Sequence, residues 1–283
     1  MSSIRLFEAA GHAALYAKFR PTPPASLNAA VINYLKIKMG SDELSHAVDV
    51  GCGSGQSTWA LAEHFTAVTG VDPSAAQIQQ ANSNNNITNI AFLEGTAESL
   101  PLPASSVQLL TACQAAHWMD MPAFFAEADR ILVPNGVVAL IGYNLATVVN
   151  HPRAAQMTAH IKQLYDEQVR LRCWNDRRKL VDGDYRDPRF RIPYPHTVRD
   201  DSHRCTRSVT VEQVKGYIGS MSGYQTYCKM KGQEQGEFVL KTFGERLLEE
   251  LGSSKAEEAA LELCHPYFLL MGRKPAPGDE TVS

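Results

Sequence analysis

The stretch Val48-Asp49-Val50-Gly51-Cys52-Gly53-Ser54-Gly55 decides the fold. It places three glycines, two residues apart, after the short apolar run His46 to Val50, which is typical of a buried strand. Glycine suits such a turn because it adopts positive φ and has no side chain to keep a ligand from the backbone. In open α/β sheets the ligand crevice lies at the carboxyl ends of the strands. The stretch therefore predicts a strand, a glycine loop and a cofactor site.

The spacing around this loop bears on which cofactor it binds. The dinucleotide fingerprint is GxGxxG, whereas the spacing here is GxGxG. Asp49 precedes the first glycine and can orient the loop or reach the amino acid part of a ligand. Asp72 closes the next apolar run, 17 residues after Gly55, where a carboxylate can accept hydrogen bonds from both hydroxyls of a ribose. The segment from Glu94 to Gln114 has no obvious counterpart in dinucleotide dehydrogenases, so NAD is disfavoured.

Working outward from the loop, strand-like and helix-like segments alternate over residues 41–144. We expect strands at Ala47 to Val50, Ala67 to Val71, Ile90 to Leu93, Val107 to Ala112 and Val137 to Tyr143, and helices at Gln56 to Phe65, Ser74 to Asn82 and Met121 to Leu132. Short apolar strands separated by helices predict a parallel sheet with helices on both faces. Residues 208–274 resume the pattern and complete the sheet, with helices at Thr210 to Met221 and Glu234 to Leu251 and strands at Tyr224 to Met230 and His265 to Gly272.

Three further segments lie outside this alternation. Residues 1–40 are predicted to be helical, with a break at the prolines that follow Arg20. Residues 145–207 form an insertion with a helix expected at Ala154 to Trp174, and residues 275–283 are expected to be a disordered tail. From Arg153 to Arg207 there are 13 Lys and Arg against 8 Asp and Glu, in a chain of net charge −3. Two interpretations stay open, a salt-bridged surface or a wall that attracts an anionic substrate.

Composition narrows the class of protein. No apolar run reaches the roughly 18 residues of a membrane span, and the N-terminus has no signal-like apolar segment, so we expect a cytoplasmic protein. The six cysteines are scattered, without the Cys and His spacing of a zinc site, and we expect reduced thiols and no metal. The sequence does not indicate an oligomeric state.

Four segments, in order, resemble the successive motifs of class I methyltransferases. They are VDVGCGSGQ at 48–56, GVDPS at 70–74, EGTAESLPLP at 94–103 and AEADRILVPNGVVALIGY at 126–143. YAKFRPTPP at 16–24 and AAHWMD at 115–120 add a resemblance to the small-molecule group of the trans-aconitate methyltransferases and their eukaryotic relatives. The resemblance implies a Rossmann-like, seven-stranded, mostly parallel sheet, S-adenosylmethionine as cofactor, and an N-terminal helical lid over residues 1–40.

The resemblance also assigns cofactor contacts. It implies that the backbone of Gly51, Gly53 and Gly55 flanks the methionine part, together with Gln114, and that Asp72, with Pro73 beside it, binds the ribose. Ala97 and Glu98 would meet the adenine edge. Many members of the family have Asp where this chain has Thr96, so Thr96 offers only a hydroxyl to the adenine. Arg20 would lie over the cofactor pocket as part of the lid, with a surface arginine as the alternative.

The acceptor side is indicated less directly. His117 and Trp118 follow the fourth strand and are the candidate catalytic pair, with His117 as a hydrogen-bond donor or base; the alternative is that His117 caps a turn and Trp118 packs in the core. Trp174, Arg177, Arg178 and Lys179 could line an anion site or be a solvated helix end. A carboxylate acceptor is ionised at pH 7 and needs no base, whereas a hydroxyl acceptor does.

We therefore expect O-methylation of a carboxylate or hydroxyl of a small molecule. Methylation of RNA or protein, with the basic segment as docking surface, is an alternative that the negative net charge disfavours. A second alternative is a cofactor-binding protein that has lost catalysis. A third is an NAD dehydrogenase, which the GxGxG spacing and the segment after Glu94 disfavour.

Overall fold

The computed structural model describes residue 15 and residues 18–39 and 44–279. Its sheet has the order β3-β2-β1-β4-β5-β9-β6, with β7 and β8 also paired to β9. The strands are β1 (Leu44–Val50), β2 (Phe65–Asp72), β3 (Ile90–Glu94), β4 (Val107–Cys113), β5 (Leu132–Tyr143), β6 (Thr147–Val149), β7 (His196–Asp200), β8 (Arg204–Thr210) and β9 (Ala260–Arg273). The helices are α2 (Ala25–Met39), α3 (Ala75–Asn84), α4 (Met121–Ile131), α5 (Ala154–Arg170), α6 (Arg178–Asp182), α7 (Val211–Gly219), α8 (Ser222–Lys231) and α9 (Gln233–Leu251).

The fold is α/β and Rossmann-like, as expected, but the sheet differs from the prediction in two ways. Within the described residues it has nine strands instead of seven, and the parallel pairs there are those among β1 to β5, since β9 runs antiparallel to each of its neighbours. The extra strands come from residues 145–207, whose polar strands β7 and β8 lie along β9. Their mixed composition hid them, because a half-exposed edge strand has no continuous apolar run.

Two expected elements are wrong. Residues 56–64 form turns around a short 3₁₀ helix, Trp59–Leu61, and Phe65 begins β2, in place of the helix expected at Gln56 to Phe65. The strand expected at Tyr224 to Met230 is helix α8, which buries Tyr224 and Tyr227, three residues apart on one helical face. Tertiary packing of this aromatic face decided the structure.

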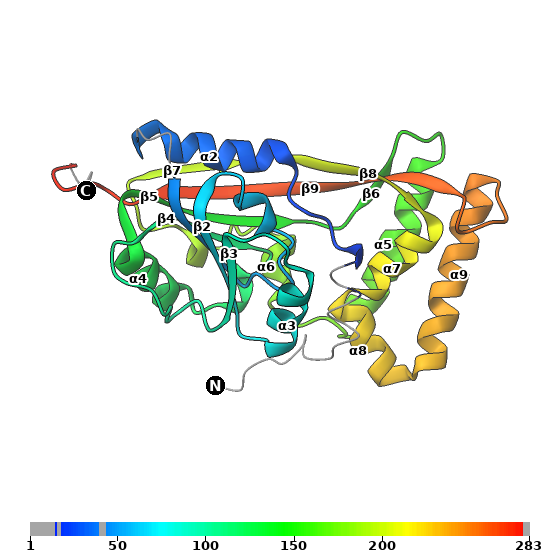
Figure 1. The fold of residues 1–283 in the computed structure, drawn as a ribbon. Helices are drawn as coiled ribbons and strands as arrows, with labels where there is room; N and C mark the ends of the chain where they lie inside the picture. The colour runs from blue at the N-terminus through cyan, green and yellow to red at the C-terminus, as the bar shows by residue number, and fades with distance from the viewer. Residues whose placement is uncertain (1–14, 16–17, 40–43, 280–283) are drawn as a thin grey trace.

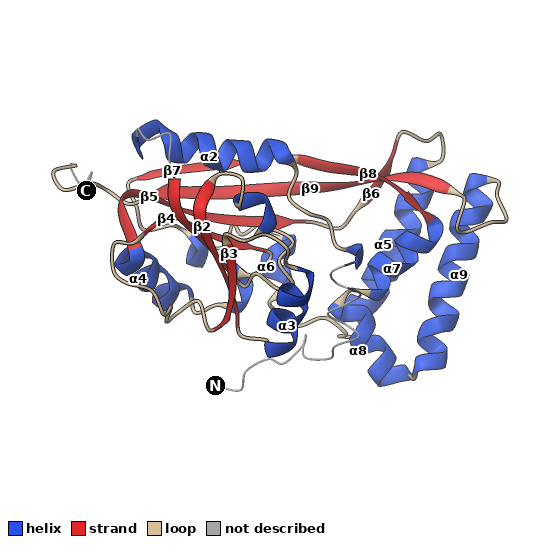
Figure 2. Cartoon of the chain, viewed as in Figure 1, coloured by secondary structure: helices blue, strands red, loops and turns tan. Residues whose placement is uncertain are grey.

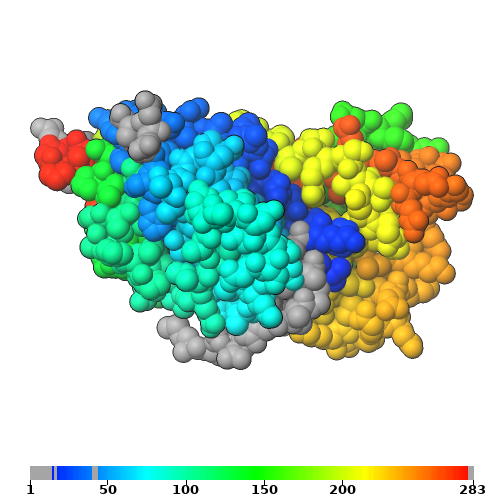
Figure 3. All heavy atoms as spheres, in the orientation of Figure 1, coloured from blue at the N-terminus to red at the C-terminus, as the bar shows by residue number. Residues whose placement is uncertain are grey.

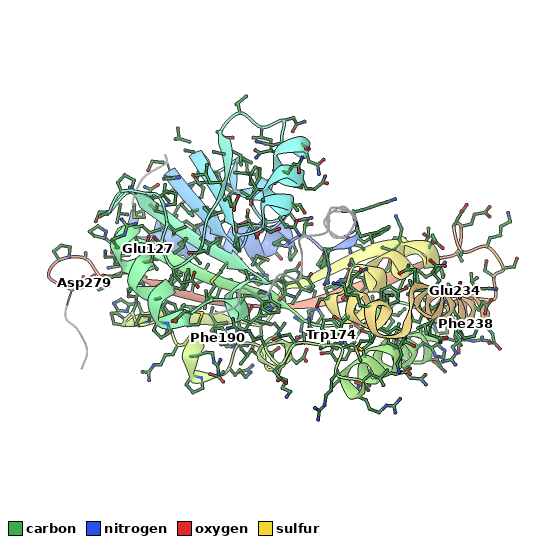
Figure 4. The ribbon with its side chains drawn as sticks, turned by 90° about the horizontal axis from the view of Figure 1, so that it is seen from below. Glu127, Trp174, Phe190, Glu234, Phe238 and Asp279 are labelled. Atoms are coloured by element: carbon green, nitrogen blue, oxygen red, sulfur yellow. The ribbon has the colours of Figure 1, made fainter. Side chains whose placement is uncertain are left out.

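The molecule has two parts, which lie at opposite ends of β9 (Figures 1 and 2). In the core lobe, one face of the sheet is covered by α2 and α3 and the other by α4, α6 and the 3₁₀ helix Pro188–Phe190. The helical lobe consists of α5, α7, α8 and α9 packed on β6, β8 and the first half of β9. Segment 171–192 reaches both lobes, since Trp174 lies at the helical lobe and Phe190 beneath the core lobe (Figure 4).

Residues 1–14, 16, 17 and 40 of the predicted N-terminal lid lie outside the described residues, and residues 25–39 of it form α2, which packs on one face of the sheet. From residue 18 to Pro24 the chain runs along the junction between the core lobe and the helical lobe, where its blue atoms separate the cyan from the yellow ones in Figure 3. Phe19 contacts the backbone of α7, because a Cβ on Gly216 would lie 2.5 Å from its ring. We call residues 18–24 the N-terminal strap. None of the described helices is long and apolar enough to cross a bilayer.

Candidate cofactor and acceptor site

The glycine loop has the geometry that requires glycine. Gly51, Gly53 and Gly55 have φ of 65°, 55° and 95°, in the region that residues with a Cβ rarely adopt. A Cβ on Gly51 would lie 2.3 Å from the Cβ of Ala115, so the loop packs directly against the end of β4. A Cβ on Gly53 would enter open space, with only a side-chain oxygen of Gln77 at 3.9 Å. The loop is therefore accessible to a ligand at Gly53.

The buried carboxylate of Asp49 fixes the conformation of the segment that carries the glycine loop. Asp49 is fully buried, and its carboxylate accepts hydrogen bonds from the hydroxyls of Ser57, Thr58 and Thr111, each at 2.7 Å. Burial raises its pKa, and these three hydrogen bonds oppose the shift. Because both carboxylate oxygens are used inside the protein, the geometry favours the loop-orienting role over contact with a ligand.

Asp72, at the end of β2, holds the loop from the side. Its two oxygens accept the backbone N–H groups of Gly53 and Ser74, each at 2.9 Å, and each oxygen keeps a lone pair for a ribose hydroxyl. Burial raises its pKa, opposed by these two N–H groups. Pro73 begins the turn into α3. The third residue of that helix, Gln77, is 3% exposed, and its Oε1 has no hydrogen-bond partner in the described part of the chain.

A pocket opens above this loop. It is lined by the loop itself, by the ends of β4 and β5, and by the N-terminal strap, through Pro21, Pro23, Gly51, Cys52, Gly53, Gln56, Ser57, Cys113, Gln114 and Tyr143. Gln114 has φ of 54° and donates from Nε2 to the carbonyl of Tyr143 at 2.7 Å. Its Oε1 is buried without a partner among the described residues. An orphaned oxygen in the wall of a pocket needs a donor, and the ammonium group of the cofactor's methionine part would be one.

The three residues expected at the adenine lie after β3, and they differ in exposure. Thr96 is exposed, Ala97 is buried and Glu98 is half-buried. The Oε1 of Glu98 accepts the backbone N–H of Asp120 at 2.9 Å, which joins this loop to the start of α4. The adenine contacts of all three residues stay predictions.

Arg20 joins the two lobes beside the pocket. Its guanidinium donates to the hydroxyl of Tyr143 at 3.3 Å and to the carbonyl of Ser220 at 3.1 Å, and it lies over the ring of Tyr217 with 5.7 Å to the centroid. Pro21 and Pro23 line the pocket, whereas Arg20 lies behind Tyr143. Its contact with the cofactor stays a prediction.

His117 and Trp118 form a short 3₁₀ turn, Ala116–Trp118, after the end of β4. His117 is buried, and its Nδ1 lies 2.7 Å from the hydroxyl of Tyr185. Burial, with the charges of Arg178 and Arg177, lowers its pKa to about 3. His117 is therefore neutral at physiological pH and a weak base. Trp118 is half-buried, with its ring 4.8 Å from that of His117, and Arg177 donates to the carbonyls of both residues.

Arg178 is the second arginine at the lobe junction. Its Nε donates to Asp182 at 2.9 Å and to the hydroxyl of Tyr165 at 3.3 Å, and its guanidinium lies over the ring of Trp174. Burial raises the pKa of Tyr217 to about 12, against the opposing charges of Arg20 and Arg178. Both cations are therefore close to one hydroxyl. Four other arginines of residues 153–207 pair with acids of the same segment, as Lys179 does; they are Arg170, Arg186, Arg189 and Arg199.

Sequence reasoning missed four of these positions. Gln77, Tyr185 and Tyr217 lie outside its motifs, and Tyr143 closes the motif at 126–143 but was given no role in the site. Gln77 lies five residues after Asp72, in the first turn of α3. Its closeness in sequence to Asp72 could have indicated that it belongs to the site. The tyrosines belong to β5, to the segment after α6 and to α7, and only the long-range fold brings them to the pocket and the residues beside it.

The comparisons with known proteins agree with this geometry. Residues 48–140 match the model of the methyltransferase domain family. A Dictyostelium discoideum protein named as a methyltransferase is 29% identical over 259 residues, which cover 92% of this chain and 92% of that protein. A Saccharomyces cerevisiae protein named as an S-adenosylmethionine-dependent methyltransferase is 26% identical over 76% of this chain and 80% of its own length.

A solved structure from Anaeromyxobacter dehalogenans, described as a type II methyltransferase, has a TM-score of 0.71 and 28% identity, and the alignment covers 92% of this chain and all of that one. The glycine loop, Asp72 and the orphaned oxygens of Gln77 and Gln114 fit the cofactor of such enzymes. The chain is an S-adenosylmethionine-dependent methyltransferase.

Proposed function

We propose that this methyltransferase transfers the methyl group to a carboxylate oxygen of a small organic acid that bears more than one carboxylate. Two observations carry the proposal: Arg20 of the N-terminal strap contacts both Tyr217 and the pocket-lining Tyr143, and the charge of Arg178 of α6, like that of Arg20, lowers the pKa of Tyr217. Guanidinium groups bind carboxylates through strong, charge-assisted hydrogen bonds. Two of them at one site fit a polyanion in which one carboxylate is held and another reacts.

The state of His117 favours a carboxylate over a hydroxyl. An alcohol or phenol must lose a proton during transfer, and a base with a pKa of about 3 is poorly matched to that task at neutral pH. A carboxylate is ionised already and needs no base. The residues of this site then have to bind and orient the acceptor and exclude water.

When bound, S-adenosylmethionine supplies an electrophilic methyl group on a sulfonium. A carboxylate oxygen forms the new bond to the methyl carbon as the carbon–sulfur bond breaks and its electron pair stays on sulfur, so no proton moves. In this assignment Asp72 and the glycine loop hold the donor. Arg20 and Arg178 hold the remote carboxylate of the acceptor. The assignment agrees with the resemblance to the trans-aconitate methyltransferase group.

The basic segment supports an RNA acceptor less than its charge count suggests, because Arg170, Arg186, Arg189 and Arg199 are each paired with an acid of the same segment. A nucleic-acid surface needs cations that are free to meet phosphates. Methylation of a protein, and binding of the cofactor without catalysis, are outcomes that the experiment below separates.

The test is a radiolabelled-methyl assay with trans-aconitate, citrate, succinate, simple phenols, RNA and a protein extract. We expect label in one or more polycarboxylic acids as a base-labile ester. Arg178→Gln should raise the KM for the acid at least tenfold, from the loss of one charge-assisted hydrogen bond, and leave the affinity for S-adenosylhomocysteine unchanged. Arg189→Gln, at an exposed arginine paired with Asp187 in the same segment, is the matched control. Label in phenols, RNA or protein alone would refute the proposal, and no label anywhere would favour a non-catalytic protein.

A further inference from the structure

The hydrogen bond between His117 and Tyr185 is buried and joins distant parts of the chain. His117 follows β4, and Tyr185 lies 68 residues later in the segment after α6. Tyr185 is 1% exposed and His117 is 8% exposed, so no bulk water competes for this bond. The pair lies beside the pocket, because Cys113, which lines it, is close enough to Tyr185 to affect its ionisation.

An unusual backbone places the Tyr185 hydroxyl. Asp184 and Tyr185 have φ of 54° and 53°, and two successive non-glycine residues in the left-handed region are costly. The conformation is held from both sides, because Asp184 accepts hydrogen bonds from the amide of Asn144 at 2.5 Å and from Arg199 at 3.0 Å. Strain of this kind persists where the surrounding structure fixes it, and it gathers at functional sites.

The ring of Tyr185 does not explain the residue type. It stacks on Phe190 with centroids 4.3 Å apart and meets Phe268 edge-on at 5.0 Å, contacts that phenylalanine would make equally well. Only the hydroxyl distinguishes tyrosine here, and its partner is His117.

The direction of this bond follows from the neighbours of the hydroxyl. Burial raises the pKa of Tyr185 well above its ordinary value, and the hydrogen-bond partner that the structure gives its hydroxyl is the Nδ1 of His117. The phenol therefore keeps its proton and has the Nδ1 of His117 as its acceptor at 2.7 Å. A nitrogen that accepts a hydrogen bond carries no hydrogen, so in neutral His117 the hydrogen is on Nε2.

We propose that Tyr185 is a positioning residue that fixes His117 as the neutral tautomer with hydrogen on Nε2, and so makes His117 a hydrogen-bond donor to the acceptor carboxylate. The inference rests on the proposed function for the identity of the acceptor. A neutral donor orients a carboxylate without the full charge of an imidazolium. Such a charge would stabilise the ionised acceptor more than the transition state, in which its negative charge is being lost.

The first test reads the tautomer directly and needs no acceptor. We would record ¹⁵N spectra of protein labelled at histidine, in complex with S-adenosylhomocysteine, and assign His117 by its missing signal in His117→Gln. We expect hydrogen on Nε2 in the wild type and a mixture of tautomers in Tyr185→Phe. Tyr194→Phe is the matched control, because it removes another buried hydroxyl of the segment, bonded to Asp129 at 3.5 Å. Hydrogen on Nδ1 in the wild type, or an unchanged tautomer in Tyr185→Phe, would overturn the proposal.

The second test asks whether the Nε2 hydrogen is used. Glutamine at 117 presents an N–H near the position of Nε2, and asparagine presents one near Nδ1. With trans-aconitate as the probe, we expect His117→Gln to stay within about tenfold of the wild-type kcat/KM. His117→Asn and His117→Ala should lose about a hundredfold, and Tyr185→Phe about tenfold, the equivalent of one hydrogen bond. Equal loss in the glutamine and alanine variants would mean a base and would overturn the donor role. If trans-aconitate and the other acids stay unlabelled, the proposed function fails, while the tautomer measurement still decides the role of Tyr185.

Discussion

Asp72→Ala removes the carboxylate on which the cofactor assignment depends most. In the folded chain its two oxygens accept the N–H groups of Gly53 and Ser74, each at 2.9 Å. Each oxygen has a remaining lone pair, and the two together match the two hydroxyls of a ribose. The variant therefore loses contacts to the cofactor and one restraint on the glycine loop.

The expected effect on affinity is larger than the effect on stability. A hydrogen bond to a charged group contributes about 1.5–3 kcal/mol. Because water solvates the site when no ligand is bound, the net loss is smaller, and we expect the binding free energy to weaken by about 1–3 kcal/mol. This corresponds to a rise in the Kd for S-adenosylhomocysteine of roughly 5- to 150-fold. The free energy of unfolding should change little, because burial raises the pKa of Asp72 and so opposes the gain from its hydrogen bonds.

Calorimetric titration with S-adenosylhomocysteine and thermal unfolding without ligand separate the two effects. Asp187→Ala is the matched control, because Asp187 also accepts the N–H two residues ahead, at 3.0 Å, but begins the 3₁₀ helix under the core lobe. Its Kd should equal that of the wild type. A Kd for Asp72→Ala within twofold of the wild type would refute the ribose assignment, and tight binding of NAD by the wild type would refute the cofactor assignment itself.

Gly53→Ala should weaken S-adenosylhomocysteine binding at least tenfold, because its Cβ would enter the open space of the site. Its positive φ should lower the free energy of unfolding by about 1–2 kcal/mol. Gly51→Ala should lower the free energy of unfolding further, since its Cβ would lie 2.3 Å from the Cβ of Ala115. Calorimetry measures the affinity of each variant, and urea unfolding measures its stability. Equal stability losses in the two variants would contradict the packing argument. His265 is fully buried with both ring nitrogens unpartnered among the described residues, and burial with Arg207 and Arg20 lowers its pKa from 6.5 to about 3. Folding then favours the neutral ring, so His265 alone lowers the free energy of unfolding by about 1.4 kcal/mol per pH unit as the pH falls from 6.5 to 3. His265→Phe should remove about 2 kcal/mol of the total loss between pH 8 and 5, and an unchanged difference would show that His265 does not contribute to it.

The core lobe could be predicted from the sequence because its signals are local. Each of its parallel strands is an apolar run, and the glycine loop and Asp72 lie directly at the ends of two of them. The helix expected after the loop failed for an equally local reason. Ser57 and Thr58 donate their hydroxyls to Asp49, and the turns that follow Gly55 hold both side chains over that buried carboxylate.

The acceptor side could not be predicted, because its contacts join residues far apart in the sequence. Arg20 reaches Tyr143 across 123 residues, and His117 reaches Tyr185 across 68. No periodicity encodes such a pair. Charge counting could not single out one cation, since Arg170, Arg186, Arg189 and Arg199 are paired with acids of the same segment, whereas Arg178, the cation proposed to bind the acceptor, lies against Trp174 and Tyr165.

Strand β9 explains how one chain builds a site between two lobes. Its second half pairs with β5 and β7 in the core lobe, and its first half pairs with β6 and β8 in the helical lobe. Pro266 lies between these halves, where β5 has ended and β6 has not begun, so its missing N–H interrupts neither ladder. A continuous strand with partners on both edges resists bending, so the distance between the lobes is set by the sheet. We therefore predict that access to the cofactor pocket depends on the N-terminal strap, which bonds to both lobes through Arg20 and lines the pocket with Pro21 and Pro23.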